Sequence, residues 1–295
     1  MDKLFDWDLT LRLLQYDFVQ AALLAAAVLG LLAGVLGPLI VSRNMAFAVH
    51  GTAELSFTGG AAALVAGLNV GFGAIVGAVL AALVFGLLSR RTADHDSVIA
   101  VVLSFGLGLG VLLLWFYKGR ATNKFGLLVG QIVGVDFTSV LLLSVCAVLV
   151  LGVLAVLYRP LLFASVDPEV AGARGVPVRL LTPVFAVLVG VATALAVQVV
   201  GALLVLALMI TPAAAACRLT ASPVRATMLA VLFAEVAAVG GIVLSLAPGA
   251  PISSFVTTIS FVIYMGCWVL ARSRGRTRGV SRAAAAPAVP QPAHR

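Results

Sequence analysis

Charged residues are scarce in this chain of 295 residues. Asp, Glu, Lys and Arg together make up 10% of it, whereas soluble domains carry about 25%. Hydrophobic residues make up 62% of the chain, and its mean hydropathy is +1.18. The composition therefore excludes the class of soluble globular domains.

The chain also lacks the short motifs of common catalytic sites. Its three cysteines, Cys146, Cys217 and Cys267, stand singly in apolar segments, which argues against a disulfide framework or a thiolate metal cage. The three lysines are followed by Leu, Gly and Phe, so the GK[ST] sequence of a P-loop is missing. No nucleophile elbow, HExxH or dinucleotide fingerprint occurs. We therefore expect a protein that is not an enzyme, holds no cofactor, and draws energy from another chain or an ion gradient.

Apolar runs of about 20 residues recur along the chain, as is typical of transmembrane helices. The runs are continuous rather than alternating, which favours helices over a barrel. We predict an all-α, polytopic transmembrane helix bundle of about nine spans, at 18–40, 45–67, 70–89, 97–117, 138–158, 180–197, 199–217, 226–247 and 253–271. The segment 180–217 is either two tight spans around Gln198 and Gly201 or one long broken helix. Glycine pairs at GxxxG spacing, at positions 30 and 34, 73 and 77, and 106 and 110, indicate close helix packing.

The positive charges predict the orientation. Nine spans with the N-terminus outside place most arginines on the cytoplasmic side, including the five of "RSRGRTRGVSR" after the last span. The net charge of +8 then reflects membrane orientation and contact with anionic lipids rather than nucleic-acid binding. We expect an extracytoplasmic segment at 1–17, a transmembrane domain at 18–272, and a basic, Ala/Pro-rich cytoplasmic tail at 273–295 that is disordered.

Three ionisable side chains fall clearly within predicted spans. His50 and Glu54 lie in the second span and Glu235 in the eighth. An ionisable group costs about 2.5–3.5 kcal/mol or more at bilayer depth, so a functional interior site is the default interpretation. His50 and Glu54 are four residues apart and share one helix face, about 6 Å apart at Cβ.

An imidazole nitrogen and a carboxylate oxygen form a ligand pair suited to Zn²⁺ or Mn²⁺. We predict a metal site of His50, Glu54 and Glu235, completed by water, a backbone carbonyl, Thr52 or Asn44. Two other interpretations remain open. His50 and Glu54 can hydrogen-bond each other as a structural pair, or the three residues can relay protons. Glu235 can also be a structural hydrogen-bonding residue.

The longest polar interruption, at 159–179, contains "SVDPEVAGARGVP". Asp167 is expected to cap a short helix that has Pro168 at its first position, and Gly175 is expected to lie at its end. A capped helix between two spans on the cytoplasmic side predicts contact with another protein.

Several segments carry a family resemblance. "VDPEVAGARGVPVRLL", followed by "QVVGALLVLALMITPAAAACRLT", resembles the permease subunit of bacterial metal-ion ABC transporters, the zinc/manganese/iron uptake family. "RNMAFAVHGTAELSFTGGAAA" resembles the family's second-span motif, and "APGAPISSFVTTISF" its turn into the last span. The resemblance extends from about residue 18 to 271. In one respect the chain departs from it: many members carry an aspartate and then a histidine where this chain has His50 and Glu54.

The resemblance implies a function and partners. The short helix would be the coupling helix that contacts a cytoplasmic ATP-binding-cassette ATPase, with Asp167, Glu169, Ala173 and Gly175 in contact. Further partners would be an extracytoplasmic metal-binding protein and a second copy of the chain, in the bacterial plasma membrane. The transported ion is expected to be zinc, ahead of manganese, because imidazole ligation and the Irving–Williams order favour it. The alternatives are a proton-coupled secondary transporter using His50, Glu54 and Glu235, and an ABC permease for a metal chelate.

Overall fold

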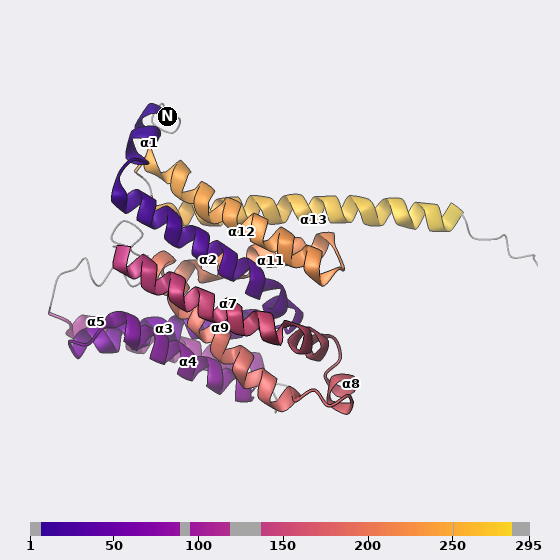
Figure 1. The fold of residues 1–295 in the computed structure, drawn as a ribbon, viewed down its shortest axis with the longest axis horizontal. Coiled ribbons are helices and arrows are strands. Elements are labelled where there is room, and N and C mark those ends of the chain that lie inside the picture. The colour runs from indigo at the N-terminus through magenta and orange to yellow at the C-terminus, as the bar shows by residue number, and fades with distance from the viewer. Residues whose placement is uncertain (1–6, 89–94, 119–136, 250, 285–295) are drawn as a thin grey trace, which may run out of the picture.

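The computed structural model describes residues 7–88, 95–118, 137–249 and 251–284, and all regular elements within these ranges are helical (Figure 1). In chain order they are α1 (Trp7–Leu13), α2 (Asp17–Ser42), α3 (Ala46–Val65), α4 (Val70–Leu88), α5 (His95–Phe116), α7 (Phe137–Val166), α8 (Pro168–Ala173), α9 (Val178–Val200), the 3₁₀ helix η3 (Ala202–Leu204), α10 (Val205–Met209), α11 (Thr211–Leu219), α12 (Pro223–Leu246) and α13 (Ile252–Ala284). The predicted all-helical membrane fold is confirmed.

Among the described residues, six helices are long and apolar enough to cross a membrane: α2, α5, α7, α9, α12 and α13. The apolar part of α4 is shorter, as is the segment of α10 and α11. Helix α3 has 20 residues but carries His50 and Glu54, and it is not one of the six. Helices thus occupy all nine predicted positions, while the count of nine spans and the outside N-terminus stay predictions.

The chain breaks and folds back after α9. Gly201 has a φ of 83°, which ends α9 and which a residue with a side chain rarely adopts. The short elements η3 and α10 follow, and the Thr193 hydroxyl of α9 lies 3.9 Å from the sulfur of Met209 in α10. Two residues 16 positions apart are therefore side by side, as expected for two tight segments around Gly201 rather than one extended helix.

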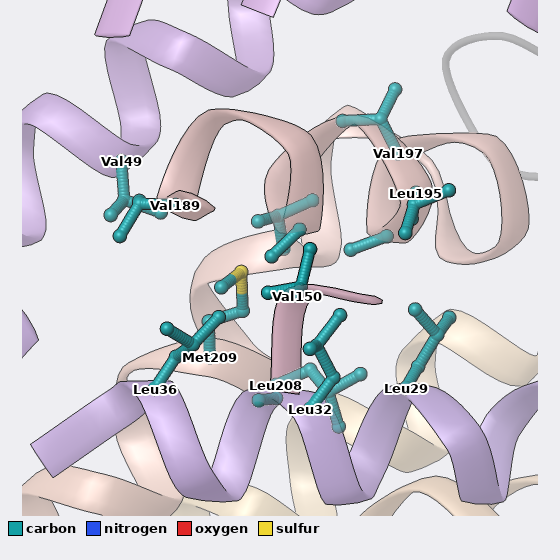
Figure 2. Close-up of a cluster of buried hydrophobic side chains, with 14 of the residues drawn as sticks. Leu29, Leu32, Leu36, Val49, Val150, Val189, Leu195, Val197, Leu208 and Met209 are labelled. Atoms are coloured by element: carbon teal, nitrogen blue, oxygen red, sulfur yellow. The ribbon is translucent and has the colours of Figure 1, made fainter. Parts of the chain in front are cut away.

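In the described part of the chain the helices pack around a large apolar core, part of which is drawn in Figure 2, and two smaller clusters lie beside it. Leucines of α2 meet Val150 of α7, while α9 and α10 contribute residues such as Leu195 and Leu208. On one side of this centre lie α3, α4 and α5, and on the other α12 and α13 (Figure 1). Helix α8 lies at one end of the bundle, beyond α7 and α9 (Figure 1).

Glycine allows the closest approaches between helices. Gly59 of α3 lies against Gly73 and Gly77 of α4, and a Cβ at Gly59 would be 3.0 Å from the Gly77 Cα and closer still to the Gly73 carbonyl oxygen. The other predicted pairs also face partners: Gly30 and Gly34 face α12, and the pair at 106 and 110 faces α3. The packing role expected of all three pairs is confirmed.

Two helices extend past the predicted boundaries. Helix α7 continues to Val166 with Pro160 inside it, and it ends where Asp167 and Pro168 start the next helix. Helix α13 continues to Ala284, beyond the predicted end of the last span at residue 271, while the disordered tail at 273–295 stays a prediction. Four arginines and two alanines, which are good helix formers, lie among residues 273–284. The segments 1–6 and 285–295, also covered by the terminal predictions, lie outside the described residues.

The α3–α4 contact leads to a stability prediction. We expect Gly59→Ala to destabilise the fold by about 1–3 kcal/mol, because the added methyl overlaps backbone atoms of α4 that cannot rotate away. Gly108→Ala on α5 is the matched control, since a Cβ there meets nothing within 4 Å. Thermal unfolding of the purified protein in detergent measures both. Equal melting temperatures for the two variants would contradict the predicted close contact.

Candidate functional site

Helix α3 carries the predicted pair and is enclosed by its neighbours. It packs against α4, α5 and α9. Gly51 contacts Phe85 of α4 and Ile99 of α5, and Val49 lies in the same apolar cluster as Val189 of α9 (Figure 2). A helix with this many polar residues is unfavourable in lipid unless other helices cover it. The position of α3 within the bundle meets that requirement.

Most polar side chains of α3 have hydrogen-bond partners. The Thr52 hydroxyl donates to the Ala48 carbonyl over 2.7 Å, and the Ser56 hydroxyl donates to the Ala74 carbonyl of α4 over 3.1 Å. The Thr58 hydroxyl lies 2.6 Å from the Gly106 carbonyl oxygen of α5. These bonds satisfy the groups and join α3 to its neighbours.

His50 and Glu54 differ from these residues. Glu54 is 2% exposed, and its Oε2 has no hydrogen-bond partner. Nδ1 of His50 is likewise buried without a partner. An unsatisfied buried polar group costs about 1–3 kcal/mol. One imidazole nitrogen and one carboxylate oxygen therefore remain available to a ligand, so a saturated structural pair does not describe these side chains.

Glu235 lies elsewhere. Helix α12 packs against α2, α11 and α13, and a Cβ added at Gly30 of α2 would be 3.0 Å from the Glu235 carboxyl carbon. This distance places the Glu235 carboxyl group against the backbone of α2. Within the described ranges, no three His, Cys, Asp or Glu residues are close enough together to hold a metal ion. The structure does not bring Glu235 to His50 and Glu54, and a role as third ligand stays a prediction.

The short helix α8 forms as the sequence predicts. The Asp167 carboxylate accepts hydrogen bonds from the backbone N–H groups of Glu169 and Val170, over 3.1 and 3.0 Å. At the other end, Gly175 has a φ of 82° and the Val176 N–H donates to the Ala171 carbonyl over 3.0 Å. Sequence reasoning therefore identified both caps correctly.

The outer surface of α8 is open. Glu169, Ala173 and Gly175 are exposed, while Ala171 is buried against the bundle. An open cleft of about 520 Å³ lies beside the helix and is lined by Pro168, Glu169, Gly172, Val176, Pro177, Val178 and Arg179. Sequence reasoning identified the helix but not the cleft, because the cleft depends on how α8 sits against the start of α9.

Comparisons with protein families, with named proteins and with solved structures all find proteins similar to this chain over most of its length. The profile described as "ABC 3 transport family" matches residues 15–271. The chain is 32% identical to the "Manganese transport system membrane protein MntC" of Listeria innocua over 86% of this chain and 92% of that protein. It is 25% identical to the "High-affinity zinc uptake system membrane protein ZnuB" of Haemophilus influenzae over 78% of this chain and 88% of that protein. Among solved structures, PsaBC from Streptococcus pneumoniae in complex with Fab matches with a TM-score of 0.80 at 27% identity, covering 88% of this chain and 94% of that one.

The unsatisfied carboxylate leads to a second stability prediction. Replacing Glu54 by methionine removes a buried oxygen without a partner and keeps a similar volume, so we expect the metal-free protein to gain about 1–3 kcal/mol. Its melting temperature in detergent with a chelator should rise by several degrees. Glu169→Met on exposed α8 serves as the control and should change little. A lower melting temperature for Glu54→Met would mean that the carboxylate stabilises the resting fold.

Proposed function

This chain belongs to the ABC 3 transport family, and on that basis we propose that it imports a divalent transition metal through a path that includes His50 and Glu54. As a family member it is a membrane permease, a transport subunit of a metal ABC importer in the bacterial plasma membrane. The observation that carries the proposed site is the pair of buried, unpartnered donor atoms on α3, Nδ1 of His50 and Oε2 of Glu54.

The chemistry of the pair suits a passing ion. A neutral imidazole and an ionised carboxylate supply one nitrogen and one oxygen donor, which replace part of the hydration shell of the ion. Two protein ligands leave the remaining positions to water or backbone carbonyls. Binding at a transport site must be favourable enough for entry and weak enough for release. An incomplete ligand set meets both requirements, whereas a four-ligand cage would hold the ion.

We propose Mn²⁺ as the principal cargo and Zn²⁺ as the alternative. The sequence alone favoured zinc through its imidazole ligand and the Irving–Williams order. A relative whose name specifies manganese is 32% identical, and a relative whose name specifies zinc is 25% identical, which supports the opposite order. A carboxylate with water ligands also suits manganese. A metal chelate is a different cargo, and its passage would not need donor atoms on α3.

We further propose that α8 is the coupling helix. Its exposed surface and the cleft beside it are suited to contact a cytoplasmic ATP-binding-cassette ATPase, with Asp167, Glu169, Ala173 and Gly175 at or near the contact. ATP hydrolysis would take place on that partner. A second copy of this chain and an extracytoplasmic metal-binding protein complete the proposed importer. A gradient-driven carrier is not favoured, because it has no use for a capped helix of this kind.

The metal site is tested by uptake of radioactive Mn²⁺ and Zn²⁺ into cells that lack other importers. We expect His50→Ala and Glu54→Ala to reduce uptake by about tenfold or more, because even residues that only support a ligand contribute 10–100-fold to metal affinity. Ser56→Ala is the control on the same helix, since its hydroxyl bonds only to the backbone of α4. Glu235→Gln should retain uptake, because Glu235 lies against α2. Normal uptake in both α3 variants, at normal expression, would refute the site and leave the chelate permease.

The coupling role is tested at the cap of α8. Asp167→Ala removes both cap hydrogen bonds and should weaken the helix by about 0.5–2 kcal/mol, whereas Asp167→Asn preserves the cap. We expect the alanine variant to lose much of the ATPase that copurifies with it in detergent, and the asparagine variant to retain it. Full retention by Asp167→Ala would argue against α8 as the docking element.

A further inference from the structure

Arg43 stands at a tight turn that leads directly into the site helix. Helix α2 ends at Ser42 and α3 begins at Ala46, so three residues reverse the chain. Asn44 adopts a φ of 53°, and the backbone N–H groups of Arg43, Asn44 and Met45 all donate back into the last turns of α2. A turn with its N–H groups bonded in this way has little freedom to deform, so a displacement of Arg43 also displaces the start of α3.

The Arg43 side chain reaches away from this turn to two other helices. Its Nε donates to the Ser165 hydroxyl over 2.7 Å, and its Nη2 donates to the Leu161 carbonyl over 3.1 Å, both on α7. Its Cζ lies 4.9 Å from the ring centre of Phe185 on α9. Arginine suits this position because its planar group can donate in fixed directions at its edge while its face stacks on an aromatic ring.

The two contacted helices are those that flank α8. Ser165 is two residues before the Asp167 cap, and Phe185 lies on α9 shortly after its start at Val178. Phe185 is itself fully buried, so the ring is a fixed support. Burial lowers the pKa of the Arg43 guanidinium from its ordinary value, in keeping with an enclosed position among neutral partners. The Arg43 side chain thus contacts α7 and α9, the helices on either side of α8, and its backbone lies in the turn that leads into α3.

We propose that Arg43 is the positioning residue through which a displacement of α8 reaches His50 and Glu54 on α3, an inference that rests on the proposed function. Apolar contacts between α3 and α9 can slide, because dispersion has no preferred direction. Two directed hydrogen bonds fix the guanidinium relative to α7, and stacking on Phe185 fixes it relative to α9. Helices α7 and α9 and the start of α3 therefore move as one body. Movement of the coupling helix then changes the position of α3 in the bundle and with it access to the metal donors.

A contact of Arg43 that only stabilised the fold would give a different result on mutation. Its loss would lower stability and reduce assembly, ATP hydrolysis and transport together. Loss of a transmitting contact leaves a folded, assembled complex that hydrolyses ATP without moving metal. The ratio of metal ions transported to phosphate released separates the two roles, because that ratio does not depend on the amount of active complex.

The experiment uses the complete transporter in proteoliposomes, with Mn²⁺ as the transported ion. The variants are Arg43→Lys, which keeps the positive charge but loses the planar guanidinium, and Ser165→Ala, which removes the hydroxyl that accepts from Arg43 Nε. Ser144→Ala is the matched control, because Ser144 is also half-buried on α7 and bonds its own helix backbone in the same i−4 manner as Ser165, with no arginine attached. We expect the transport ratio to fall by about tenfold in Arg43→Lys, within the range of coupling between sites. For Ser165→Ala we expect about threefold, the scale of one hydrogen bond.

The transport ratio of the double variant should be no lower than that of Arg43→Lys, since both changes break the same contact between Arg43 and Ser165. Unchanged ratios in Arg43→Lys and Ser165→Ala would overturn the proposal. So would an equal loss in Ser165→Ala and Ser144→Ala, which would indicate general damage to α7. If Arg43→Lys fails to assemble, Ser165→Ala against Ser144→Ala decides the question. Absence of Mn²⁺ and Zn²⁺ transport by the unaltered complex would instead reject the proposed function.

Discussion

A polar helix inside a hydrocarbon environment must be surrounded by other helices, and the arrangement of this protein follows from that constraint. Helix α3 carries His50, Glu54 and several hydroxyl residues, and lipid offers none of them a hydrogen-bond partner. Helices α4, α5 and α9 surround it, and backbone carbonyls of α4 and α5 accept hydrogen bonds from Ser56 and Thr58. Close approach through Gly59, Gly73 and Gly77 makes the bond from Ser56 to α4 possible, because a side chain at any of them would hold α4 away from α3.

Much of the fold could be predicted from the sequence because the signals were local. Apolar runs located all nine helical regions, and Asp167, Pro168 and Gly175 fixed the ends of α8 through hydrogen bonds within a few residues. Helix α13 extends past the predicted span end at residue 271 because arginine and alanine favour a helix even where the apolar signal has ended. Whether a segment of moderate polarity crosses the membrane depends on its neighbours, which is why α3 departs from the six clear candidates.

The candidate site was predictable only in part. The i, i+4 spacing of His50 and Glu54 places them on one face from sequence alone. The position of Glu235 depends on which helix α12 packs against, and that is decided by Gly30 and Gly34 on α2, far away in the chain. Arg43 gave no signal at all in the sequence, because a basic residue between two spans is explained by membrane orientation. Its contacts with Ser165 and Phe185 exist only in the folded bundle.

The contacts of Arg43 and the unpartnered donor atoms of His50 and Glu54 lie close together in the chain. Arg43 lies in the turn before α3 and His50 in the second turn of that helix, seven residues later, so the directed contact to α7 and the unsatisfied donors belong to one short segment. A donor pair that must bind and then release an ion cannot be stabilised by its own hydrogen bonds, since such bonds would compete with the ion. Its position must therefore be held by the helix that carries it. The hydrogen bonds that fix α3 lie elsewhere on that helix and at its start, and they leave the donor atoms free.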